Sequence, residues 1–89
     1  MGVTLEEYDR LEREVKTDYV RHTPTQRLAL GLVRLSELTA EQDIACTDDV
    51  LYGPGGGPDS HYFEKADILL LLSLGWRWHA TVESWAFVV

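Results

Sequence analysis

Four consecutive leucines at residues 69–72 constrain the fold of this chain more than any other feature. They lie in the segment DSHYFEKADILLLLSLG, which we expect to form a helix that Asp59 or Ser60 caps and Gly75 ends. A leucine run places apolar side chains on every side of a helix, so this helix should be the most buried one. The rest of the chain therefore has to pack around it.

The length of 89 residues favours one compact domain over residues 1–89, with a thin margin of stability. A hydrophobic share of 45% with three Trp indicates a packed globule rather than a disordered chain. The longest apolar run, residues 68–72, is far too short to span a membrane. The single cysteine, Cys46, cannot form an intramolecular disulfide, and a small buried cysteine is the expected interpretation. We therefore expect a cytoplasmic protein.

The first predicted helix covers residues 4–19, where Thr4 is the expected cap and Glu7 completes a capping box. Apolar side chains recur along it at spacings of three and four, namely Leu5, Tyr8, Leu11, Val15 and Tyr19. A stripe this narrow predicts packing against the domain, or alternatively the seam of a homodimer.

The second predicted helix begins at Thr23, with Pro24 at its first position and Gln26 in the capping-box place. Its expected buried face carries Leu28, Ala29, Leu32, Val33 and Leu35. Its expected solvated side carries Arg27, Arg34 and Glu37. Gly31 weakens the helix by about 1 kcal/mol relative to alanine, which suggests a close neighbour. A short helical turn is expected in residues 39–45.

The tail WRWHATVESWAFVV changes to a period of two, which predicts a hairpin turning at residues 83–84 or through a four-residue loop. One face would then carry Trp78, Ala80, Val82, Trp85, Phe87 and Val89. A helix from residue 82 onwards is the competing interpretation. A lone hairpin is marginal, so it should lean on the helices or join another strand. Residues 47–52 could supply that strand or form a helical turn.

These elements predict an α+β domain with two or three N-terminal helices, a buried central helix and a C-terminal β-hairpin. An all-α fold is the alternative. The three tryptophans Trp76, Trp78 and Trp85 are expected in the core, although so dense a group would also suit a docking surface.

The Gly/Pro-rich loop at residues 53–60 has the glycines of a phosphate-binding loop but lacks its Gly-Lys-Ser/Thr sequence. Asp59 would also place its own negative charge at the end of the following helix. We therefore expect a flexible connector, with a partner-contact loop as the alternative. Because no paired metal ligands or catalytic triad appear, we expect no metal, no cofactor and no enzymatic activity.

The net charge of −7 is concentrated in residues 39–89, where only Lys65 and Arg77 are basic. Such a half repels phosphate backbones, so direct nucleic-acid binding is not expected. A helix-turn-helix regulator is also disfavoured, because its recognition segment AEQDIACTDD would be acidic.

The acidic and glycine-rich stretch at residues 43–64 is the expected contact surface for another protein with a basic surface. Its candidate contact residues are Asp43, Asp48, Asp49, Tyr52, Asp59, His61 and Glu64. The expected function is a non-enzymatic binding module that acts as an accessory or inhibitory factor. One alternative is a nucleic-acid mimic that inhibits a nuclease or a DNA-binding protein. The other alternative is a small structural or homodimeric scaffold protein, in which two copies would associate through the helix of residues 4–19.

Overall fold

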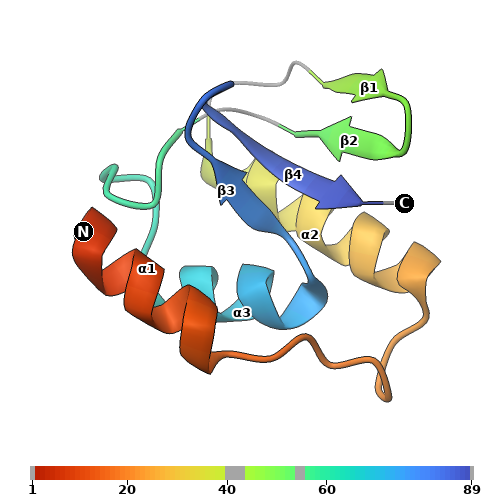
Figure 1. The fold of residues 1–89 in the computed structure, drawn as a ribbon, viewed down its shortest axis with the longest axis horizontal. Helices are drawn as coiled ribbons and strands as arrows, with labels where there is room; N and C mark the ends of the chain where they lie inside the picture. The colour runs from red at the N-terminus through yellow and green to blue at the C-terminus, as the bar shows by residue number, and fades with distance from the viewer. Residues whose placement is uncertain (1, 40–43, 54–55, 89) are drawn as a thin grey trace.

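The computed structural model describes residues 2–39, 44–53 and 56–88, and within them three helices and a four-stranded antiparallel sheet (Figure 1). The elements are α1 (Leu5–Glu14), α2 (Pro24–Leu38), β1 (Ala45–Thr47), β2 (Val50–Tyr52), α3 (Lys65–Leu74), β3 (Arg77–His79) and β4 (Ser84–Val88). The strand order in the sheet is β1-β2-β4-β3. The α+β prediction is confirmed and the all-α alternative is wrong.

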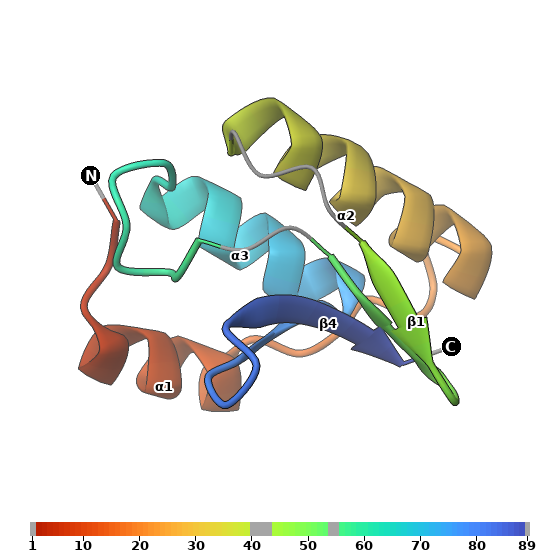
Figure 2. The same ribbon diagram turned by 90° about the horizontal axis from the view of Figure 1, so that it is seen from above.

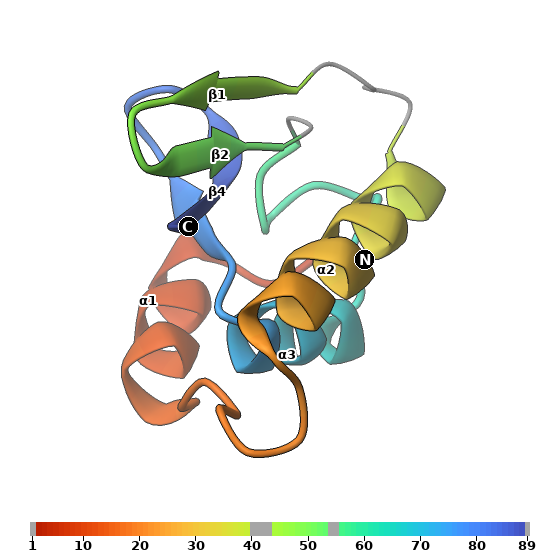
Figure 3. The same ribbon diagram turned by 90° about the vertical axis from the view of Figure 1, so that its right-hand side faces the viewer.

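The helices lie on one side of the sheet, and α3 lies between α1 and α2 (Figure 3). α3 packs against both of the other helices, as its leucine run predicted. Ile68, Leu71 and Leu72 are fully buried, whereas Leu70 remains 42% exposed. The central helix is therefore covered on most of its circumference, but not on all of it.

α3 begins at Lys65, later than the predicted start at Asp59 or Ser60. The backbone N–H of Glu64 donates to the carboxylate of Asp67 at 2.9 Å, which satisfies the start of the helix there. Gly75 ends the helix as predicted, with a left-handed φ of 96°. The end was correctly predicted because only glycine adopts that conformation without strain.

α1 is capped by Thr4 as predicted, since Glu7 donates its N–H to the Thr4 hydroxyl at 3.1 Å. The helix ends at Glu14, however, and not at residue 19. The carboxylate of Asp18 accepts the N–H groups of residues 20 and 21, which forms a turn in place of a further helical turn. Tyr19 is therefore 73% exposed and does not continue the apolar stripe.

α2 has the predicted capping box between Thr23 and Gln26, but its buried face is rotated from the predicted one. Arg27, Gly31 and Leu35 are buried, whereas Val33 is 57% exposed. A Cβ atom on Gly31 would overlap the indole of Trp76, so the ring packs directly on the helix backbone. The prediction that Arg27 lies on a solvated face is wrong. Because Trp76 packs on Gly31, the side of α2 that carries Arg27, Gly31 and Leu35 faces the core.

The polar side of α2 also makes an internal contact through Arg34. Its Nε and Nη2 atoms donate to the Asp67 carboxylate at 3.0 and 2.6 Å. Asp67 is only 6% exposed, and this hydrogen-bonded ion pair raises the pKa of Arg34. The contact joins α2 to the first turn of α3.

The C-terminal hairpin forms, but in another register than the predicted turn at residues 83–84. Trp78 pairs with Trp85 rather than with Val89, and residues 80–83 form the connecting loop. The predicted faces of Trp78, Trp85 and Phe87 remain correct because the shift is an even number of residues. The competing helix from residue 82 is wrong, and β2 joins β4 as expected.

Within residues 47–52 the brief-strand alternative is confirmed for β2 (Val50–Tyr52), and the helical turn is wrong. Thr47 ends β1, Asp48 and Asp49 form a turn, and β2 begins at Val50. The helical turn expected in residues 39–45 lies largely outside the described residues. Trp76 and Trp85 are fully buried, and Trp78 packs against the core while partly exposed.

Candidate functional site

The structure divides the predicted contact residues between two places. Asp48 and Asp49 lie in the β1–β2 turn, and Tyr52 ends β2. The other described members, Asp59, His61 and Glu64, lie in the segment before α3. Figures 1 and 2 show this segment and the β1–β2 turn on opposite sides of the molecule. Asp43 lies outside the described residues, so the predicted stretch does not form one continuous surface.

The β1–β2 turn presents two adjacent carboxylates to solvent. Asp48 and Asp49 are both exposed, and neither has an ion-pair or hydrogen-bond partner among the described residues. Asp48 has a φ of 53°, a conformation that aspartate tolerates better than most side chains. The turn therefore holds two free negative charges close together.

The strand β1, next to these carboxylates, is an open edge of the sheet. All its residues are exposed, including Cys46, which was wrongly expected to be buried. The pair Thr47↔Val50 closes the turn, and Cys46 pairs with Leu51 one step further. Since hydrogen-bonded and non-hydrogen-bonded pairs alternate in an antiparallel ladder, the backbone N–H and C=O of Cys46 point outward. This edge can accept another strand.

The opposite edge, β3, is covered by α1. The N–H of Trp78 donates to the Tyr8 hydroxyl at 2.7 Å. The Tyr8 ring also packs edge-on against Trp85, with 5.8 Å between the ring centroids. The two edges of the sheet therefore differ, and β1 is the accessible one.

The Tyr52 ring packs edge-on against His79, with 6.1 Å between the ring centroids. Tyr52 pairs with Ala86, so these two positions share a face of the sheet. Trp85, the next residue along β4, points to the opposite face and into the core. Tyr52 and His79 therefore lie on the side of the sheet away from the helices. Sequence reasoning selected Tyr52 but missed His79, which shows no motif.

The described part of the Gly/Pro loop is anchored, which corrects the expectation of a flexible connector. The indole N–H of Trp85 donates to the Gly56 carbonyl at 2.9 Å. Val3 donates its N–H to the carbonyl of Pro58 at 3.0 Å, and Pro58 is fully buried. Asp59 is exposed in this loop and does not lie at the start of a helix.

Within residues 2–39, 44–53 and 56–88, no group of three His, Cys, Asp or Glu side chains is placed to hold a metal ion. Over the same described ranges, the helices are too short or too polar to cross a bilayer. A scan of protein-family models and searches of curated proteins and of solved structures found no match to this chain.

Proposed function

We propose that this protein is a non-enzymatic binding module whose β1–β2 hairpin docks onto a basic surface of another protein as an accessory or inhibitory factor. One observation carries the proposal. The hairpin combines an exposed edge strand, Ala45–Thr47, with the two unpaired carboxylates of Asp48 and Asp49.

The charge of the protein supports this mode of binding. The net charge of −7 attracts a basic partner over long range, and the exposed carboxylates of the turn orient the encounter. Such attraction mainly increases the association rate and decreases with added salt.

The open edge of β1 supports the second part of the contact. A partner strand can hydrogen-bond to the outward-facing N–H and C=O of Cys46, which extends the sheet. Because β1 has only three residues, the edge offers few such bonds, and we expect the charged turn to add to them. The proposed contact surface is therefore the whole hairpin, from Ala45 to Tyr52.

The alternatives fit this geometry less well. A nucleic-acid mimic needs a row of carboxylates at phosphate-like spacing, whereas the turn carries only Asp48 and Asp49. The apolar stripe of α1 is used within the domain, because Tyr8 and Leu11 are buried in the core. We therefore do not extend the proposal to a dimer through α1.

Replacing Asp48 and Asp49 together with asparagine is expected to slow association with the partner about three- to tenfold, because two steering charges are lost. The dependence of the association rate on salt should flatten as well. The partner is first captured from an extract of the cells that make the protein, then purified, and its binding rates are measured over a series of salt concentrations.

The matched control is Asp9→Asn with Glu14→Gln, which removes the same charge from exposed positions on α1. This variant should associate nearly as fast as the original protein. Equal slowing by both pairs would show that only net charge matters, and unchanged rates in the hairpin variant would place the contact elsewhere.

A further inference from the structure

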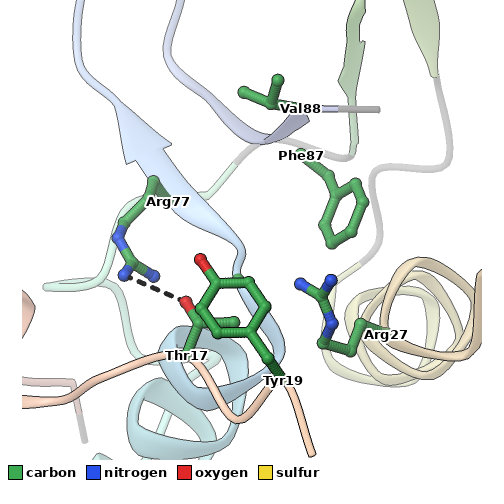
Figure 4. A pocket seen from close by; sticks show the side chains of 7 residues that line it. Thr17, Tyr19, Arg27, Arg77, Phe87 and Val88 are labelled. Carbon is green, nitrogen blue, oxygen red and sulfur yellow. Dashed lines mark hydrogen bonds between the residues drawn. The ribbon is translucent and has the colours of Figure 1, made fainter. Parts of the chain in front are cut away.

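A cavity of about 380 Å³ opens between the segment after α1, the start of α2 and the strands β3 and β4 (Figure 4). Its lining residues are Thr17, Tyr19, Arg27, Gly75, Arg77, Phe87 and Val88. None of them belongs to the β1–β2 hairpin, so this site is independent of the proposed docking surface.

Arg27 is the unusual member of this lining because it is a largely buried arginine with no counter-charge among the described residues. Arg27 as a whole is only 8% exposed, and its Nε atom is buried with no hydrogen-bond partner among the described residues. Among the described residues, no carboxylate pairs with its guanidinium. A buried, unpaired cation is costly, so its persistence needs an explanation.

Aromatic rings compensate the charge of Arg27 only in part. Its guanidinium carbon lies 4.8 Å from the centre of the Tyr19 ring and 5.7 Å from that of Phe87. Such cation–π contacts are worth about 0.5–2 kcal/mol each, which is less than a buried charge loses on leaving water. Figure 4 shows the guanidinium between these two rings, facing the open space of the cavity.

The second arginine of the cavity is held by its own neighbours. Arg77 donates from Nη1 to the carbonyls of Leu72 and Trp76, both at 3.0 Å, and its Nε lies 3.8 Å from the Glu12 carboxylate. Its Nη2 lies 3.5 Å from the Thr17 hydroxyl oxygen. Arg77 therefore forms a fixed positive wall, whereas the Arg27 guanidinium donates no hydrogen bond within the part of the chain that the structure describes.

We propose that this cavity binds a small organic anion, with a carboxylate or phosphate group on Arg27 and an apolar body against Phe87 and Tyr19. An anionic oxygen would pair with the buried guanidinium through charge-assisted hydrogen bonds. The volume lies within the range of small-molecule sites, and the mixture of apolar walls with few polar groups is typical of them.

The test is a titration of the ¹⁵N-labelled protein followed by NMR at constant ionic strength, with benzoate and phenyl phosphate as probes. Benzyl alcohol serves as the neutral probe and sodium chloride as the salt control. We expect saturable shifts with a Kd of about 1 mM or below for at least one anion. The shifts should include the side-chain Nε of Arg27 and the backbone amides of Gly75 and Phe87.

The decisive variant is Arg27→Met, which keeps most of the side-chain volume and removes the charge. It should weaken anion binding at least about tenfold, because it removes the ion pair. The matched control Arg21→Met changes an arginine whose side chain is 78% exposed, and it should bind as the original protein does.

Saturation by one anion only would identify the head group and support the site. The proposal is overturned if neither anion gives saturable shifts, if benzyl alcohol gives the same shifts, or if Arg27→Met binds equally well. Should that variant fail to fold, the Nε signal of Arg27 in the unaltered protein decides the outcome.

Discussion

Replacing Gly31 with alanine is expected to destabilise the protein by about 2–3 kcal/mol, as overpacked cores do. Alanine is the better helix former by about 1 kcal/mol, so helix propensity alone predicts that the substitution stabilises the protein. The added Cβ would overlap the indole of Trp76, which is fully buried. The ring cannot retreat freely, because its Nε1 donates to the Arg27 carbonyl at 3.2 Å. Thermal and urea denaturation measure the change.

Two controls separate packing from propensity. Ala29→Gly, at an exposed position of the same helix, should cost about 1 kcal/mol through propensity alone. Gly31→Ala should cost less in a Trp76→Phe background, because the smaller ring leaves room for the methyl group. A stabilising effect of Gly31→Ala would contradict the close packing of Trp76 on α2.

Tyr8→Phe is the second substitution with a large expected effect, a loss of about 1–3 kcal/mol in stability. The hydroxyl accepts from the N–H of Trp78 at 2.7 Å and donates to the Glu12 carboxylate at 3.3 Å. Burial raises the pKa of Tyr8, so the hydroxyl stays protonated at neutral pH. Without the Tyr8 hydroxyl, the backbone N–H of Trp78 at the β3 edge loses its hydrogen-bond acceptor in α1. Denaturation and the exchange rate of the Trp78 amide report the loss.

Tyr62→Phe is the matched control, because the Tyr62 ring is partly exposed and stacks on His61, with 4.3 Å between the ring centroids. This variant should change stability by no more than about 0.5 kcal/mol. Equal effects of the two substitutions would show that the Tyr8 hydroxyl does not cover the sheet edge.

Local signals predicted several ends of helices correctly. Thr4, Thr23 and Gly75 act through nearby backbone groups, so their roles can be recognised without the rest of the fold. The start of α3 was mispredicted because Asp59 and Ser60 resemble a cap as closely as Glu64 does. The nearby Asp67, whose carboxylate accepts from the Glu64 N–H, is the signal that could have distinguished them.

Features that depend on distant contacts could not be predicted in the same way. The burial of Arg27 follows from the packing of Trp76 on Gly31, which joins residues far apart in the sequence. The spacing of Arg27, Gly31 and Leu35 by four residues each places them on one helix row, and this was the available signal.

In the candidate site, too, features set by neighbouring residues could be predicted, whereas features set by distant contacts could not. Asp48, Asp49 and Asp59 are exposed, as charged side chains in turns usually are. Their separation could not be predicted, because it depends on the β1–β2 hairpin and on the anchored loop before α3. β1 itself was missed because a strand of three exposed residues has no apolar alternation.

The most direct test of the docking proposal is amide hydrogen exchange of the protein, free and bound to its purified partner. The proposal predicts slower exchange in the complex at the Cys46 amide and in the Asp48–Asp49 turn. Residues 59–64 and α1 should exchange at unchanged rates. Protection at residues 59–64 or along α1, with residues 45–52 unchanged, would contradict docking through the β1–β2 hairpin.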